Sequence, residues 1–149
     1  KIPEFNIKIK SNIDEWTLLS FIDSCKGKKE INVLLHSLGG DAESAWSIAE
    51  YVRLSGIKMN VYCSRVESAA IIILWAAKNK YSFKHCSFMY HLGVAGEGKL
   101  EDYEKHQKKI DYFNELYRKI TPKNIKLNHK PIYLTAKEAL KLKIITKIL

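Results

Sequence analysis

Strand-like and helix-like patterns of apolar residues alternate three times in the first half of the chain. Residues 5–10 alternate apolar and polar side chains, as a half-buried strand does. Directly after them, Ser11 with Asp14 predicts a capping box at the start of a helix. Strands over 31–35 and 58–63 each precede a further stretch with helical spacing. Alternation at this spacing predicts βαβ units, and therefore a parallel sheet with right-handed crossovers.

The second half of the chain completes this predicted α/β domain. Apolar residues cover every side of the helix expected over 67–78, so that helix should lie buried in the core. The other expected elements are, in chain order, short strands near 81–83 and 87–91, a long amphipathic helix over 99–120, a short helix opened by a Thr135–Glu138 capping box, and a final strand over 144–149. No internal repeat or linker interrupts the pattern, which indicates one domain with a mostly parallel sheet.

Composition narrows the class of protein further. A chain of 149 residues with 46% hydrophobic and 28% charged content is typical of one folded domain and excludes disordered, collagen-like and disulfide-scaffold classes. The longest apolar run, 69–77, is far shorter than the ~20 residues that span a bilayer, and no basic-then-apolar leader precedes it. Three cysteines in apolar surroundings indicate a reducing compartment. We therefore expect a cytoplasmic protein with no membrane partner.

The net charge of +9 comes mainly from the end of the chain, where residues 121–149 hold seven lysines and one acidic residue, Glu138. No stacking aromatic residues interleave these lysines, and no helix-turn-helix or RNA-recognition signature accompanies them. Net charge alone bears on solubility more than on partners, so we expect a solvated face and no nucleic-acid partner. The histidines and cysteines lack metal-ligand spacing, so we expect neither a metal nor another cofactor.

Three features could carry chemistry, and each also has a plainer interpretation. Gly39-Gly40 after a strand can turn backbone N–H groups toward a developing negative charge, although paired glycines usually mark only a turn. Ser68 opens the buried helix, where free N–H groups suit a nucleophile and its oxyanion hole, although serine there is commonly an N-cap. His91 ends a strand and could act as general base to a serine, although a lone histidine is usually structural.

In chain order these features resemble the ClpP-type serine peptidases of the ClpP/crotonase fold. Four stretches carry the resemblance: Ser37-Leu38-Gly39-Gly40 for Ser-Pro-Gly-Gly, Ser64-Arg65-Val66-Glu67-Ser68 followed by Ala69-Ala70 for the nucleophile turn Gly-x-Ala-x-Ser, Met89-Tyr90-His91 for Met-x-His, and Tyr133-Leu134-Thr135-Ala136-Lys137-Glu138-Ala139 for aromatic-Leu-Ser/Thr-Ala-x-Glu-Ala. No single stretch is decisive, but four in this order are specific. The resemblance covers about residues 5–149 and is strongest to compact or phage-like members.

The resemblance implies repeated ββα units in a single peptidase domain, from which a handle helix projects. The head would comprise about 1–92 and 122–149, and the handle about 93–121. By resemblance we expect a homo-oligomeric ring. Apolar residues on the handle, beyond the needs of the domain's own core, predict subunit contacts there: Tyr103, Ile110, Phe113 and Tyr117.

The resemblance also implies a serine endopeptidase that cleaves peptides or unfolded proteins and needs no cofactor. Ser68 would attack the peptide carbonyl group, and His91 would take the proton of its hydroxyl. The N–H groups of Gly39 and Ala69, beside Gly40, would form the oxyanion hole.

Departures from the family pattern bear on these expectations. Pro131 stands where the family has the triad aspartate, so Asn128 or His129 becomes the candidate to orient His91. Ser64 replaces the glycine that usually opens the nucleophile turn. The N-terminal axial segment of large ClpP rings is absent from this sequence, so an ATP-dependent unfoldase partner is disfavoured.

Other functions stay open at the level of sequence. Without a triad acid, which can be worth ~10⁴ in kcat, the chain could be a catalytically degenerate ring subunit with a structural role. A Ser-Lys dyad with Lys99 or Lys105 as base is disfavoured because His91 lies in a Met-x-His context. An acyl-CoA enzyme of the crotonase branch would leave Ser68 and His91 without a purpose. The serine endopeptidase is therefore the leading hypothesis.

Overall fold

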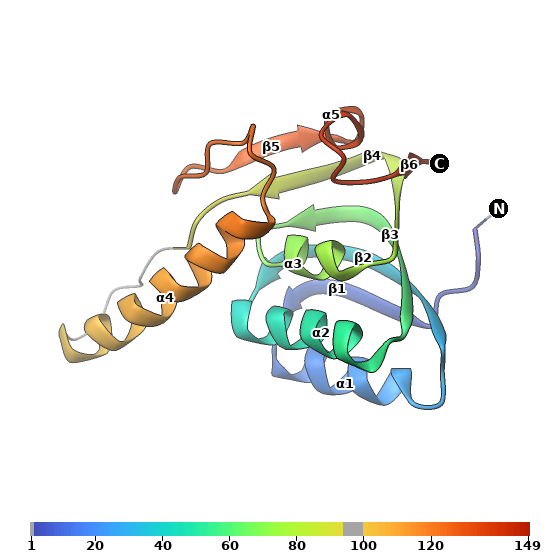
Figure 1. Ribbon diagram of the computed structural model, residues 1–149, viewed down its shortest axis with the longest axis horizontal. Helices are drawn as coiled ribbons and strands as arrows, with labels where there is room; N and C mark the ends of the chain where they lie inside the picture. Colours follow the sequence, from blue (N-terminus) through green and yellow to red (C-terminus); the bar gives the residue numbers. More distant parts are fainter. Residues whose placement is uncertain (1, 94–99) are drawn as a thin grey trace.

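The computed structural model describes residues 2–93 and 100–149, with side chains from residue 104 onward in the second range. Its elements are, in chain order, β1 (Ile7–Ile13), α1 (Glu15–Cys25), β2 (Glu30–Gly40), α2 (Ala42–Ser55), β3 (Lys58–Glu67), α3 (Ala70–Ala76), β4 (Asn79–Tyr90), α4 (Leu100–Ile120), β5 (Ile132–Thr135), α5 (Ala136–Lys141) and β6 (Lys147–Ile148). Helices α1, α2 and α3 lie together beside the sheet, while α4 extends away from it (Figure 1).

A six-stranded sheet forms the centre of the described part of the molecule. Its strand order is β1-β2-β3-β4-β5, and the first four strands pair in parallel. β5 pairs antiparallel with β4, and the short β6 pairs in parallel with the first part of β4. Parallel strands that are neighbours in both sequence and space need right-handed crossovers, so the three connecting helices share one face. The predicted α/β fold with a mostly parallel sheet is confirmed.

The boundaries predicted around β3 and β4 are wrong, because both strands are longer than the pattern indicates. β3 continues to Glu67, so the helix expected from residue 67 begins only at Ala70. β4 is a single strand where the sequence predicts two short ones. Its pairing with β3 skips residues 83–86, and the strand continues through that irregular stretch. The short β5 has no counterpart among the predicted elements, because four residues carry little periodicity.

Polar side chains cap the helices largely as the sequence predicts. The first helix is capped by Asp14, which exchanges hydrogen bonds with Thr17, whereas Ser11 lies within β1 at a φ of +60°. The capping box that included Ser11 is therefore wrong by three residues. Asp41 caps α2 by accepting a hydrogen bond from the Ser44 N–H, and Thr135 caps α5 in a reciprocal capping box, both as expected.

Helix α3 lies in the core of the domain, as its uniformly apolar sequence predicts. Ala70 through Leu74 are each at most 2% exposed, and Trp75 is the partly exposed residue of the helix. The helix packs on α2 and on the sheet strands β2 and β3. The helix that follows Ser68 is thus fixed by contacts with α2, β2 and β3. Within the described residues, no helix has the length and hydropathy needed to cross a membrane.

Part of the apolar stripe of α4 contacts this same chain. Tyr117 is buried, and Ile110 and Phe113 are half-buried and line a cleft beside α3. The side chain of Tyr103 lies outside the described residues. Tyr112, on another face, is 61% exposed. Subunit contacts through α4, like oligomerisation itself, stay a prediction.

Candidate active site

Ser68 lies in the tight turn between β3 and α3, in a backbone conformation that serine rarely adopts. Its φ is +55°, in the left-handed region. The N–H of Ser68 donates to the carbonyl oxygen of Met89 on β4 at 2.8 Å, and this bond holds the turn. Helix α3 has no side-chain cap, so Ser68 is not its N-cap. The turn instead leaves the hydroxyl group free to face the end of β4.

His91 follows β4 and faces that hydroxyl group. Its Nε2 atom lies 2.7 Å from Ser68 Oγ, a hydrogen-bond distance that suits proton transfer. Partial burial lowers the pKa of His91, and the nearby imidazole of His129 lowers it further. A lowered pKa keeps the ring neutral at neutral pH, and a neutral ring is the form that can accept a proton. The sequence prediction that these two side chains meet across a cleft agrees with this geometry.

Close packing around the two glycines at the end of β2 leaves no room for a side chain, which is a stricter requirement than that of a simple turn. At Gly39, where φ is +100°, a Cβ atom would lie 2.8 Å from Ser68 Cβ. At Gly40, where φ is +142°, it would overlap the carbonyl oxygen of Ile13. Gly40 and Ala69 line the cleft, whereas Gly39 packs behind the serine. In this structure the Gly39 N–H donates to Ser37 Oγ at 3.0 Å.

Among the described residues, the His91 ring makes a hydrogen bond through Nε2 to Ser68 and none through Nδ1, and no carboxylate bonds or pairs with it. The backbone carbonyl of Asn128 accepts from the Leu92 N–H at 2.9 Å, while its side-chain Oδ1 accepts from the Lys130 N–H at 2.7 Å. Both sequence candidates for a third member therefore lie on a loop beside His91. Asn128 is bonded to its own loop, and His129 is close enough to influence the pKa of His91.

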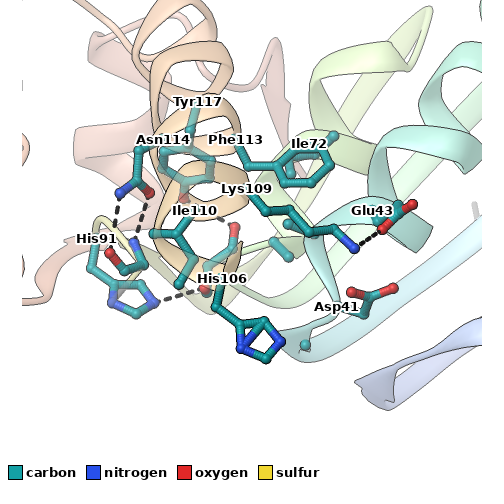
Figure 2. Close-up of a pocket in the computed structure, with 15 residues that line it drawn as sticks. Asp41, Glu43, Ile72, His91, His106, Lys109, Ile110, Phe113, Asn114 and Tyr117 are labelled. Atoms are coloured by element: carbon teal, nitrogen blue, oxygen red, sulfur yellow. Dashed lines mark hydrogen bonds and ion pairs between the residues drawn. The ribbon is translucent and has the colours of Figure 1, made fainter. Parts of the chain in front are cut away.

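Two polar residues of α4 hold the site, and the sequence analysis did not place them there, since it assigned Tyr117 to subunit contacts and did not name Asn114. The Asn114 side chain brackets Gly93, accepting from its N–H at 2.9 Å and donating to its carbonyl at 3.1 Å (Figure 2). The Tyr117 hydroxyl donates to the Ser68 carbonyl at 3.0 Å. Burial raises the pKa of Tyr117, so it stays a neutral donor. No sequence signal indicated these two bonds, because the partners are backbone groups far away in the chain.

A cleft of about 550 Å³ opens over Ser68 and His91, with α2 and α3 on one side and α4 on the other. Ile72, Ile110 and Phe113 give it apolar walls. Polar and charged side chains complete the lining: Asp41, Glu43, His106, Lys109 and Asn114. A concave, largely apolar site with a few convergent polar groups is the usual form of a substrate-binding site. Among the described residues, no group of three or more potential metal-ligating side chains occurs.

The other sequence candidates lie elsewhere. Ser64, which stands in place of the family's glycine, has its Oγ 2.9 Å from Nδ1 of His36, and neither residue lines the cleft. Lys105, proposed as an alternative base, is exposed and also lies outside the lining. Lys99 falls outside the described residues. The structure therefore brings Ser68, His91, Gly40 and Ala69 together, and leaves the lysine alternative without support from Lys105.

Known proteins resemble this chain over nearly its whole length. The sequence profile of the Clp protease family matches residues 4–149, nearly the whole chain. A proteolytic subunit 2 of the ATP-dependent Clp protease from Treponema denticola is 27% identical to it. That similarity covers 97% of this chain and 78% of the relative.

Proposed function

Because the chain belongs to the Clp protease family, we propose that it is a serine endopeptidase with Ser68 as nucleophile and His91 as general base. The observation that carries this proposal is the 2.7 Å separation of Ser68 Oγ and His91 Nε2. The two residues line a cleft of about 550 Å³, which supports peptide binding at the same place. The other hydrogen-bonded serine–histidine pair among the described residues, Ser64 and His36, lies outside that cleft.

The proposed reaction follows from the protonation states at the site. Neutral His91 accepts the hydroxyl proton of Ser68 as Oγ attacks the peptide carbonyl carbon, and a tetrahedral oxyanion forms. The resulting imidazolium then donates its proton to the leaving amine, which breaks the C–N bond and leaves an acyl-enzyme. A water molecule, activated by His91 in the same way, hydrolyses that ester and restores Ser68.

Backbone N–H groups would stabilise the oxyanion, and Ala69 is our first assignment. Ala69 follows the nucleophile directly, and it lines the cleft. The Gly39 N–H is engaged by Ser37 Oγ at 3.0 Å, so its contribution requires that hydrogen bond to be exchanged. Removing one donor from such a hole typically lowers kcat by about 10² to 10³.

A second candidate, a catalytically degenerate ring subunit, is favoured by one observation. Pro131 occupies the place of the triad aspartate, and no carboxylate bonds to His91 in the described chain. A triad acid normally fixes the tautomer in which Nε2 is free to accept a proton. We propose that His91 works without one, so that turnover is slow compared with enzymes that have a complete triad.

A fluorophosphonate probe separates these two candidates because it reacts only with an activated serine. We expect labelling of the native chain, no labelling of Ser68→Ala, and a loss of at least about 10³-fold in peptide turnover for Ser68→Ala or His91→Ala. Ser64→Ala is the matched control, since Ser64 also contacts a histidine but lies outside the cleft. Labelling that persists in Ser68→Ala overturns the assignment. A folded native chain with neither labelling nor turnover supports the degenerate subunit.

A further inference from the structure

An ion pair between two helices lies at the edge of the cleft. Lys109 extends from α4 to the carboxylate of Glu43 on the first turn of α2 (Figure 2). The two side chains are 55% and 56% exposed, so both remain accessible to a bound molecule. The Glu43 carboxylate raises the pKa of Lys109, which keeps the ammonium group charged at neutral pH.

This ion pair shares one cleft with Ser68, and apolar side chains line the same space. Ile72, Ile110 and Phe113 supply the apolar walls. The neighbouring Asp41 carboxylate is already occupied as a helix cap, because it accepts from the N–H and the hydroxyl of Ser44 at 3.0 and 2.6 Å. Those hydrogen bonds leave the Asp41 carboxylate its negative charge, which also raises the pKa of Lys109, whereas the charges of Glu43 and Lys109 offset each other.

We propose that the Glu43–Lys109 pair sets the charge selectivity of the cleft, so that a substrate with an acidic side chain at this position is disfavoured relative to one with an uncharged side chain. This inference rests on the proposed peptidase function. An acidic side chain that enters the cleft must either separate Lys109 from Glu43 or remain unpaired beside the carboxylates of Glu43 and Asp41. Both outcomes disfavour binding, whereas an uncharged side chain leaves the pair intact. Selectivity of this kind arises from rejection as much as from attraction.

Because the two residues of the pair carry opposite charges, removing one charge or the other should shift substrate preference in opposite directions. Lys109→Met removes the ammonium group and keeps an apolar stem of similar length, which leaves Glu43 free. Peptide turnover should then shift toward a basic side chain. Glu43→Gln leaves Lys109 free, and turnover should shift toward an acidic side chain. The double variant should show neither shift. Each change should be about three-fold to five-fold relative to an uncharged side chain, the size expected of a partly exposed charge pair.

The measurement uses peptides that differ at one scanned position, with Leu, Arg or Glu, and compares ratios of kcat/KM. The same peptides, bound to proteins that also carry Ser68→Ala, give ratios of affinity by fluorescence polarisation without turnover. Lys108→Met is the matched control on the same helix, since Lys108 does not line the cleft. Circular dichroism confirms that each variant is folded.

The outcomes of the inference and of the proposed function can be told apart. If the native chain cleaves none of the peptides, the proposed function fails, and the affinity ratios still test the pair. Opposite shifts for Lys109→Met and Glu43→Gln support the inference. If both variants keep the native ratios in turnover and in affinity, the ion pair does not set selectivity and the inference is overturned.

Discussion

At the scale of single residues, the geometry of the site depends on the lack of a side chain at Gly39 as well as on the reacting groups. Ser68 can hold its left-handed conformation because Gly39 has no side chain at the point of contact. Backbone strain of this kind, typically about 1–3 kcal/mol, persists only where the surroundings enforce it. Here the surroundings are the Met89 carbonyl and the Tyr117 hydroxyl, both bonded to the backbone of Ser68.

Gly39→Ala should therefore disturb the nucleophile directly. The added Cβ would meet Ser68 Cβ at 2.8 Å on a backbone with φ of +100°, so either the turn or the strand has to move. We expect fluorophosphonate labelling of Ser68 to slow by at least about ten-fold, the equivalent of about 1.4 kcal/mol. Gly56→Ala is the control, since Gly56 also has a positive φ but nothing within 4 Å. Equal labelling rates for the two variants would contradict the proposed packing role.

The pH dependence of turnover should report the environment of His91. Only the neutral ring can accept the Ser68 proton, so kcat/KM should fall as pH drops through the pKa of His91. Burial and His129 both lower that pKa, which places the acidic limb below the ordinary value of 6.5. Removing the second imidazole with His129→Gln should move the limb to higher pH while leaving it below 6.5, because burial remains.

The measurement is a profile of kcat/KM from acidic to neutral pH with a fluorogenic peptide. His85→Gln, at an exposed position on β4, should leave the profile unchanged. An acidic limb at or above 6.5 in the native chain would mean that His91 is not the group that titrates.

At the scale of elements, the sequence predicts well where one force dominates and poorly where several compete. Helix α3 is apolar on every side, so its burial could be read directly from residues 70–76. The start of that helix could not, because β3 extends to Glu67 through pairing with β4, which the local pattern does not contain. Ser68 and His91 were identifiable by their places after strands. Asn114 and Tyr117 were not, because their partners are backbone groups far away in sequence.

The burial of α3 makes the stability of the domain sensitive to its side chains. Ile73 is 0% exposed, so Ile73→Ala should lower the free energy of unfolding by about 2–5 kcal/mol through lost burial and a residual cavity. Leu54→Ala on α2 is the control, because Leu54 is 86% exposed and its removal should change stability by less than about 0.5 kcal/mol. Urea unfolding followed by circular dichroism measures both. Similar losses for the two variants would contradict the described packing.

At the scale of the whole molecule, the open question is how chains associate. The proposed ring predicts a particle several times heavier than the 17.2 kDa chain. Exposed apolar side chains away from the cleft support an interface on the head, most clearly Trp16 at 76% and Leu19 at 49% exposed, both on α1. Light scattering at micromolar concentration measures the mass, and Ser68→Ala should leave it unchanged. A mass near 17.2 kDa would contradict the ring.

β4 pairs with strands from both the early and the late part of the chain, and this affects when the nucleophile becomes active during synthesis. Thr146 bonds to Lys80, 66 positions earlier, and β5 also joins β4 from the last part of the described chain. Contacts that span such separations form late, since loop closure must precede them. A growing chain can contain Ser68 and His91 long before β4 has both of its neighbours. Ribosome-stalled chains that end at residue 130 should therefore resist fluorophosphonate labelling, so that a newly made chain carries no working nucleophile until its last strands have been added.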